Sequence, residues 1–204
     1  MHRSKRVGDT LRRIQPIVLL LAATLPGWAV GPTLPRDPDL PNYHQVDDNV
    51  YRGAQPTEEG FKALRKAGIK TVIDLRPDGE DSSHSVRKEQ AIVEGQGMHY
   101  VNVPLSGVFA PSRETISKLL AMMTDAETGP VFIHCLRGAD RTGTVIASYR
   151  IQHDHWKNRD ALHEADSLGM SWHEVAMKHF VSDFRPEASP GAPAALEAPS
   201  KPAL

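Results

Sequence analysis

Cysteine is scarce in this sequence: Cys135 is the only one among 204 residues. A lone thiol has no intramolecular partner for a disulfide, so the fold does not depend on such a crosslink and is compatible with an oxidising compartment. A strong charge of either sign is also missing, since 24 basic and 25 acidic residues leave a formal net charge of −1. This balance gives no indication of a nucleic-acid partner.

Long hydrophobic runs are missing as well. The apolar stretch at residues 17–25 is too short for a comfortable membrane span. Five basic residues precede it and the breakers Pro26 and Gly27 follow it, which is the layout of a signal peptide over residues 1–31. Cleavage would leave 19 basic and 24 acidic residues, a net charge near −5, in a periplasmic or secreted protein. The alternative is that the leader is retained as an N-terminal anchor. A membrane is predicted as a partner only in that case.

The remaining chain divides into three parts. A proline-rich linker is predicted over residues 32–41, one folded domain over 42–184, and a disordered tail over 185–204, where Pro, Ala and Glu alternate without periodicity. A hydrophobic fraction of 40% is enough for one core. No internal repeat is visible.

Strand and helix patterns alternate within the domain. Apolar residues at i, i+3, i+4 and i+7 from Ile116 to Met123 indicate a core-facing helix, and Gly68 suits the end of a helix that starts near Glu58. This alternation predicts an α/β single domain with a mostly parallel central sheet flanked by helices. The expected strands cover residues 43–46, 49–52, 69–75, 98–103 and 131–133, and another helix covers 86–94. A last apolar stripe is predicted to join the core: Ala176, Met177, Phe180, Val181 and Phe184.

The clearest chemical pattern is the decapeptide HCLRGADRTG at residues 134–143. A short apolar strand precedes it and a helical pattern follows Arg141, so this loop lies between the carboxyl end of a strand and the amino end of a helix. Free backbone N–H groups and the helix dipole favour an anion at such a place. They also favour the thiolate form of Cys135, which could then attack phosphorus without a separate base.

The other residues of the decapeptide fit the same chemistry. Arg141 offers a planar fork for two phosphoryl oxygens, and Gly138 lets the backbone turn its amides inward. The Thr142 hydroxyl is placed to stabilise the thiolate as it departs, and His134 is expected to support the loop from behind. The predicted phosphate-binding residues are Leu136, Arg137, Gly138, Ala139, Asp140 and Arg141.

The decapeptide resembles the signature of the cysteine-dependent tyrosine and dual-specificity phosphatases. Residues 49–56, the strand end at 73–76, and Tyr149-Arg150 followed by Trp156 and residues 161–164 resemble the compact bacterial dual-specificity-like phosphatases, which include exported members. The resemblance covers about residues 42–184. It implies the phosphatase fold and a two-step reaction in which Cys135 takes the phosphoryl group and water releases it, with no metal or cofactor. It implies a phosphorylated protein or a small phosphomonoester as the partner.

The sequence departs from that family at the general acid. The usual aspartate lies on the loop before the helix that precedes the nucleophile, and residues 104–111 contain none. A proton for the leaving group is worth about a hundredfold or more in rate. Asp140 is the predicted acid, with Glu114 as the runner-up and a helix-capping role for Asp140 as its structural alternative. The remaining candidates lie on another strand-end loop: Asp78, Glu80 and Asp81.

Several alternatives stay open at this stage. The missing aspartate favours a phosphate-binding pseudophosphatase as the second hypothesis, and an inositol or lipid phosphate phosphatase is a further reading. A rhodanese-like sulfur transferase ranks third, because its loop is typically shorter. Arg76 and Arg137 are either phosphate contacts or ordinary surface charges and salt-bridge partners. The His153-Asp154-His155 run resembles half of a metal site but indicates a solvated turn.

Overall fold

The computed structural model describes residues 38–81 and 85–187. The predicted leader at 1–31, residues 32–37 of the predicted linker and residues 188–204 of the predicted tail lie outside these residues, so those predictions stay predictions. Within the described part of the chain, no helix has both the length and the apolar character needed to cross a membrane.

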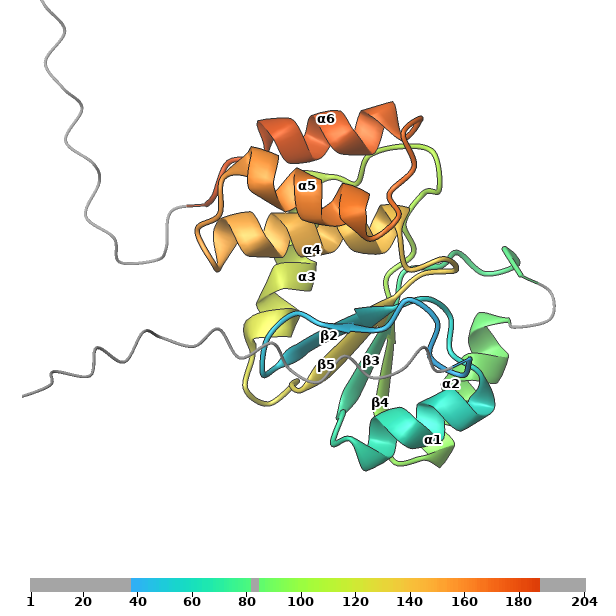
Figure 1. Ribbon diagram of the computed structural model, residues 1–204. Coiled ribbons are helices and arrows are strands. Elements are labelled where there is room, and N and C mark those ends of the chain that lie inside the picture. Colours follow the sequence, from blue (N-terminus) through green and yellow to red (C-terminus); the bar gives the residue numbers. More distant parts are fainter. Residues whose placement is uncertain (1–37, 82–84, 188–204) are drawn as a thin grey trace, which may run out of the picture. The chain divides into compact units, whose positions relative to one another are not determined.

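A five-stranded sheet forms the centre of the domain (Figure 1). Its order is β1-β2-β5-β3-β4, and all neighbours are parallel except β1 and β2, which are antiparallel. The mostly parallel sheet predicted from the alternating pattern is therefore confirmed. The strands are β1 (His44–Gln45), β2 (Val50–Gly53), β3 (Thr71–Asp74), β4 (His99–Asn102) and β5 (Val131–His134).

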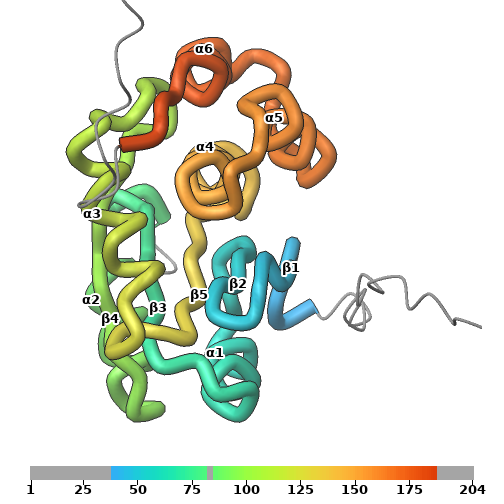
Figure 2. The backbone as a smooth tube through the Cα atoms, turned by 90° about the vertical axis from the view of Figure 1, so that its left-hand side faces the viewer, coloured from blue at the N-terminus to red at the C-terminus, as the bar shows by residue number. Residues whose placement is uncertain are grey.

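Helices cover both faces of the sheet, as Figures 1 and 2 show. On one face lie α1 and α2; on the other α3 and α4 pack on the sheet, with α5 and α6 beyond α4. The helices are α1 (Glu58–Lys66), α2 (Val86–Gly95), α3 (Arg113–Thr124), α4 (Asp140–Gln152), α5 (Asn158–Ser167) and α6 (Val175–Asp183).

The central strand β5 shows why both faces are covered. All four of its side chains are buried, with Val131 and Ile133 in the core under α3 and α4, and Phe132 in the core under α1 and α2. Alternate residues of a strand point to opposite faces, so an uninterrupted apolar run needs a layer on each side. The domain therefore has two hydrophobic cores separated by the sheet.

The helix boundaries follow local capping signals. The side chains of Thr57, Ser85 and Ser112 accept hydrogen bonds from the first turns of α1, α2 and α3. The predicted stripe at the end of the domain is correct for Met177, Val181 and Phe184, which are buried, but wrong for Ala176, which is exposed. Helix α6 is an outer helix in Figure 1, so only one side of it faces the core.

The parallel arrangement decides where a site can form. The carboxyl ends of β2, β3, β4 and β5 meet at one edge of the sheet, and the loops that follow these strands gather there. Two hydrogen bonds join the segments that leave neighbouring strands at this edge. Leu75 N donates to His134 O at 2.9 Å, and Leu105 N donates to Leu75 O at 3.0 Å. Clefts at this edge are the usual ligand sites of open α/β sheets.

Candidate active site

The predicted phosphate loop lies at this carboxyl edge. Cys135 follows β5 directly and α4 begins at Asp140, so the loop connects the central strand to the most deeply buried helix. Both side chains predicted to carry the chemistry are largely buried, with Cys135 2% and Arg141 6% exposed. The strand, loop and helix arrangement expected from the sequence is confirmed.

The carbonyl groups of the loop accept hydrogen bonds from β2 and from residues on either side of it. Gln55 N donates to Leu136 O at 3.2 Å, and Asn42 Nδ2 donates to the carbonyls of residues 137 and 138 at 3.2 and 3.1 Å. Arg52 Nη2 also donates to Gly138 O at 2.6 Å. Three successive carbonyls thus have partners on the side facing β2.

The amide groups of the same loop are left open. None of the backbone N–H groups from Leu136 to Arg141 donates to an acceptor within residues 38–81 and 85–187. Because their carbonyls are held by β2 and its flanks, these N–H groups at the amino end of α4 are available to an anion, and we call the loop from Leu136 to Arg141 the nest. Such a nest, together with the helix dipole, suits a phosphoryl group.

Gly138 makes this loop conformation possible. Its φ is +67°, in the left-handed region that favours glycine. A Cβ at this position would lie 2.4 Å from the backbone of Gly53 and Ala54. The close approach of loop and strand therefore excludes any larger residue, which agrees with the role predicted for Gly138.

Arg141 is held by a carboxylate from the loop after β3. Its Nη1 and Nη2 donate to Glu80 at 2.9 and 2.7 Å, and its Nε donates to no acceptor among the described residues. Burial alone would lower the pKa of Arg141, but the Glu80 hydrogen bonds and the nearby Cys135 charge raise it. The ion pair fixes the end of the guanidinium and leaves its Nε side for another anion. Sequence reasoning considered Glu80 only as an acid and missed this contact.

His134, at the end of β5 directly before the loop, is fully buried. Its Nε2 is 2.8 Å from Glu89 Oε1 and its Nδ1 is 3.3 Å from the carbonyl oxygen of Cys135. A carbonyl oxygen can only accept, so Nδ1 carries a hydrogen, and a second hydrogen on Nε2 would make the ring an imidazolium paired with Glu89. Although burial opposes it, the Glu89 carboxylate raises the pKa of His134 above its ordinary value of 6.5.

A buried polar cluster surrounds this histidine. Arg76 Nη2 donates to Asp74 at 2.8 Å and to Glu89 at 2.6 Å, and all three side chains are at most 2% exposed. Burial opposes ionisation of Asp74, but His134 and Arg76 lower its pKa. The salt-bridge reading of Arg76 is therefore correct, and the surface reading is wrong. Two carboxylates balance two cations.

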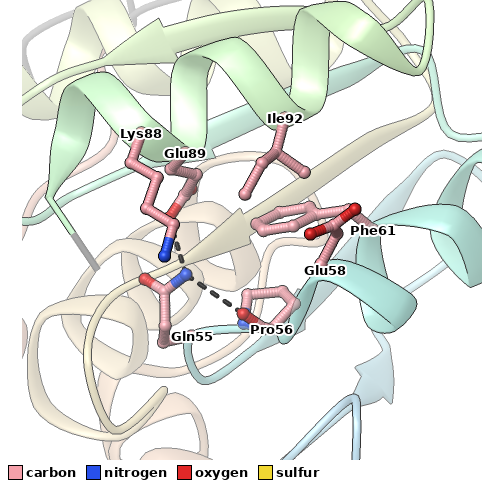
Figure 3. Close-up of a pocket in the computed structure, with 7 residues that line it drawn as sticks. All are labelled: Gln55, Pro56, Glu58, Phe61, Lys88, Glu89 and Ile92. Carbon is pink, nitrogen blue, oxygen red and sulfur yellow. Dashed lines mark hydrogen bonds between the residues drawn. The ribbon is translucent and has the colours of Figure 1, made fainter. Parts of the chain in front are cut away.

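Gln55 connects the phosphate loop to this cluster. Figure 3 shows its Nε2 between Glu89 and Pro56, at 2.6 Å from Glu89 Oε2 and 3.2 Å from the Pro56 carbonyl oxygen. Its backbone N–H holds the loop at the same time. A cavity of about 20 Å³ lies beside these groups between α1 and α2, and is separate from the nest. The residues drawn around it are Gln55, Pro56, Glu58, Phe61, Lys88, Glu89 and Ile92.

The carboxylates proposed as acids have different surroundings. Asp140 Oδ1 accepts from Ser171 N at 2.8 Å and Oδ2 lies 3.5 Å from Arg137. The capping alternative for Asp140 is wrong, because α4 is capped at Ala139 without a side-chain hydrogen bond. Glu114 is on the surface of α3 with Lys118 2.6 Å away, and that hydrogen bond lowers its pKa.

The side chain of Arg137 points toward the segment between α5 and α6. It donates to Ser171 Oγ at 3.1 Å and to Gly169 O at 3.1 Å. Asn42 Nδ2 donates to Leu168 O at 3.3 Å on the same side. These contacts place residues 168–171 against the phosphate loop. Because the Arg137 side chain is 55% exposed and lies 3.5 Å from Asp140, the reading of Arg137 as a surface charge and salt-bridge partner is correct.

Arg52 is a functional candidate that the sequence analysis missed. It is 1% exposed, and its Nε and Nη1 have no hydrogen-bond partner among the described residues. Burial lowers its pKa to about 10, while Glu164 and Cys135 oppose this shift. The hydroxyl of Thr142 is likewise buried and without a hydrogen-bond partner in the described chain. The signal for Arg52 was available in residues 49–56, which contributed to the family resemblance.

Within residues 38–81 and 85–187, two groups of side chains are close enough together to hold a metal ion. One is the Asp74, Glu89 and His134 cluster, in which Arg76 already binds both carboxylates. The other joins Asp47 to His153 and Asp154, and so supplies the third residue that the sequence did not reveal. Asp47 accepts hydrogen bonds from two backbone amides and from Tyr149, so its oxygens are engaged by the protein.

Known proteins share both the sequence pattern and the fold that carry this site. Residues 24–183 match the family model described as DSP-PTPase phosphatase fused to NAD+ kinase. The chain is 28% identical over 166 residues to the dual specificity protein phosphatase TpbA of Pseudomonas aeruginosa strain UCBPP-PA14, covering 74% of this chain and 72% of that protein. It is 27% identical over 152 residues to the inositol diphosphatase DSP5 of Arabidopsis thaliana, covering 71% and 70%. The crystal structure of P. aeruginosa TpbA has a TM-score of 0.60 at 23% identity, covering 73% of this chain and 88% of that one.

The family match spans most of the chain and includes the nucleophile, the arginine and the nest between them. The chain belongs to the DSP-PTPase phosphatases. It is a cysteine-dependent phosphatase of the tyrosine and dual-specificity type, and the phosphatase fold predicted from the decapeptide is confirmed.

Proposed function

We propose that the chain hydrolyses phosphomonoesters of proteins, phosphotyrosine above all, through a cysteinyl-phosphate intermediate. One observation carries this proposal: the loop from Cys135 to Arg141 presents open amides and an oriented guanidinium around a buried thiol. The dual specificity phosphatase TpbA, to which the chain is similar, supports the same substrate class.

The reaction has two steps. Cys135 Sγ attacks phosphorus, forming the S–P bond as the bond to the leaving oxygen breaks, and that oxygen takes up a proton. Water then attacks phosphorus, the S–P bond breaks, and phosphate and the thiolate are released. Throughout, Arg141 and the loop amides stabilise charge on the equatorial oxygens. The Thr142 hydroxyl stabilises the departing thiolate, and Asp140 is kept as the proposed acid.

A second candidate is an inositol phosphate phosphatase. The specific observation in its favour is the similarity to the inositol diphosphatase DSP5. The same nest would bind such a phosphate, so the loop does not separate the two candidates. Any feature that selects between a phosphorylated protein and an inositol phosphate must therefore lie around the nest.

The test is a substrate panel with the full-length protein under reducing conditions. We expect turnover of a small aryl phosphate and of phosphotyrosine peptides, and slower turnover of phosphoserine peptides, phosphoinositides and inositol phosphates. A well-folded protein that hydrolyses none of them while binding phosphopeptides would overturn the enzyme in favour of a binding module. Preference for inositol phosphates would select the second candidate.

We also propose export. The basic N-terminus, the short apolar segment and the breakers after it support cleavage near residue 31 and a periplasmic or secreted location. Mass spectrometry of the N-terminus of the cellular protein tests this proposal. A mature chain that starts near residue 32 is expected, and an intact leader in a membrane fraction would instead establish an anchor.

A further inference from the structure

Exposed apolar side chains occur on two segments of the domain, one after β4 and one between α5 and the start of α6. Within residues 38–81 and 85–187, the large hydrophobic side chains that are exposed are Val108, Phe109, Trp172 and Val175, at 69%, 72%, 85% and 58%. We call these four the apolar rim. Val108 and Phe109 lie in the loop after β4, Trp172 lies between α5 and α6, and Val175 is the first residue of α6. Apolar side chains that are exposed close to a binding site can serve as an interaction surface.

The two loops lie on opposite sides of the phosphate loop. Val108 and Phe109 follow β4, one edge strand of the sheet, and their backbone N–H groups donate to Ser106 Oγ at 3.1 and 3.0 Å. Trp172 follows Ser171, which binds Arg137 and Asp140 next to β1, the other edge. Figure 2 agrees, since α4 lies between α5 and the segment that leads into α3. The two segments that carry the rim therefore belong to opposite edges of the sheet, and the phosphate loop on the central strand β5 lies between them.

The charges around the nest argue against a ligand rich in phosphate. The loop after β3 carries Asp78, Glu80 and Asp81 at the same edge of the sheet. Glu80 already neutralises Arg141, and Arg137 lies 3.5 Å from Asp140. A polyphosphorylated inositol or an anionic bilayer needs an excess of cations that these loops do not supply.

We propose that the apolar rim binds hydrophobic residues that flank a phosphorylated residue in a polypeptide substrate. This inference rests on the proposed function and assigns its substrate class. The nest holds a single phosphoryl group, while Phe109 and Trp172 bury apolar neighbours on either side of it. Transfer of such large side chains out of water stabilises the complex, and a phosphopeptide with apolar neighbours offers the complementary surface.

The test compares two phosphotyrosine peptides of equal length and charge, one with Leu and Phe around the tyrosine and one with Ser and Gln. We expect kcat/KM for the apolar peptide to be about tenfold higher, which corresponds to about 1.4 kcal/mol. Phe109→Ser and Trp172→Ser should each remove most of this preference. Both variants should leave turnover of a small aryl phosphate unchanged, because neither side chain contributes to the nest.

Lys118→Ser is the matched control, since Lys118 is exposed on α3 and outside both loops. It should treat the two peptides as the parent protein does. Equal kcat/KM for the two peptides in the parent protein would overturn the proposal, as would rim variants that keep the preference. The proposal would also be overturned if the rim variants lost hydrolysis of phosphoinositides on vesicles but kept their turnover of both peptides. That result would show that the rim binds a bilayer. Failure to hydrolyse even the small aryl phosphate would instead contradict the proposed function.

Discussion

At the scale of single residues, Arg52 lowers the stability of the fold but contacts the phosphate loop. A buried guanidinium with two nitrogens unpaired in the described structure is unfavourable, because its lost hydration is only partly replaced. Its one hydrogen bond goes to Gly138 O in the middle of the nest. Arg52 therefore orients the loop and places a positive charge near Cys135.

Arg52→Met tests this role. We expect turnover of an aryl phosphate to fall roughly tenfold or more, because loss of a hydrogen bond to a charged donor is worth about 1.5–3 kcal/mol. The melting temperature should stay the same or rise, since a buried cation without a carboxylate partner is replaced by an apolar chain of similar length. Thermal unfolding and steady-state kinetics measure both. A large fall in melting temperature would show that Arg52 is mainly structural.

The leaving-group proton is the second question at this scale. Glu80 forms two hydrogen bonds with Arg141, so Glu80→Gln should slow all substrates about equally by disturbing the arginine. Asp140→Asn should slow alkyl phosphates much more than an activated aryl phosphate, because only poor leaving groups need the proton. Rates across leaving groups of graded basicity separate these effects. A steeper dependence in Glu80→Gln than in Asp140→Asn would make Glu80 the acid.

At the scale of elements, the phosphate loop depends on its contact with the end of β2. Gly138→Ala would place a Cβ 2.4 Å from the backbone of Gly53, and it would also force alanine to a φ of +67°. We expect a loss of about 1–3 kcal/mol in stability and loss of most activity. Chemical denaturation and aryl phosphate turnover are the measurements.

Gly143→Ala is the matched control for this prediction. Its new Cβ would meet the methyl end of Met170 at 3.2 Å, and a flexible methionine can move. Alanine also suits a helix interior better than glycine, by about 1 kcal/mol. Comparable damage from both substitutions would show that the close contact between Gly138 and β2 does not determine the loop conformation.

Much of this element-level structure could be predicted from the sequence. Strand β5 and the turn into α4 were predictable because an uninterrupted apolar run and a glycine-bearing loop have few alternatives. The partners of the loop were not predictable. Asn42, Arg52 and Gln55 reach it only because β2 pairs with β5, and strand order is a long-range property that local patterns do not contain. The same limit hid the contact between Glu80 and Arg141.

At the scale of the whole molecule, the buried cluster under the loop connects folding to pH. His134 has a raised pKa in the folded state, so folding binds its proton more tightly than the unfolded chain does. Its contribution to stability is complete below pH 6.5, the ordinary value, and is lost as pH rises through the higher folded pKa. Stability should therefore decline above pH 6.5.

Urea unfolding at several pH values tests this prediction, in a Cys135→Ser background so that oxidation of the thiol does not interfere. Glu89→Gln in the same background should make the protein less stable and the decline smaller, because the imidazolium loses its carboxylate. If both proteins show the same pH dependence, His134 is not an imidazolium in the folded protein.

At the scale of the whole molecule, the fold class could be predicted from the sequence. The buried cluster could not, because Asp74, Glu89 and His134 are distant in sequence and only the fold brings them together.

The central claim is that Cys135 is the nucleophile in a phosphate-binding nest. Its most direct test is to measure Cys135→Ser for both turnover of a small aryl phosphate and equilibrium binding of inorganic phosphate. We predict that turnover is abolished, because a hydroxyl without a base is a poor nucleophile, while phosphate affinity stays within a few-fold of that of the parent protein. Turnover equal to that of the parent protein would contradict the assignment of Cys135 as the nucleophile.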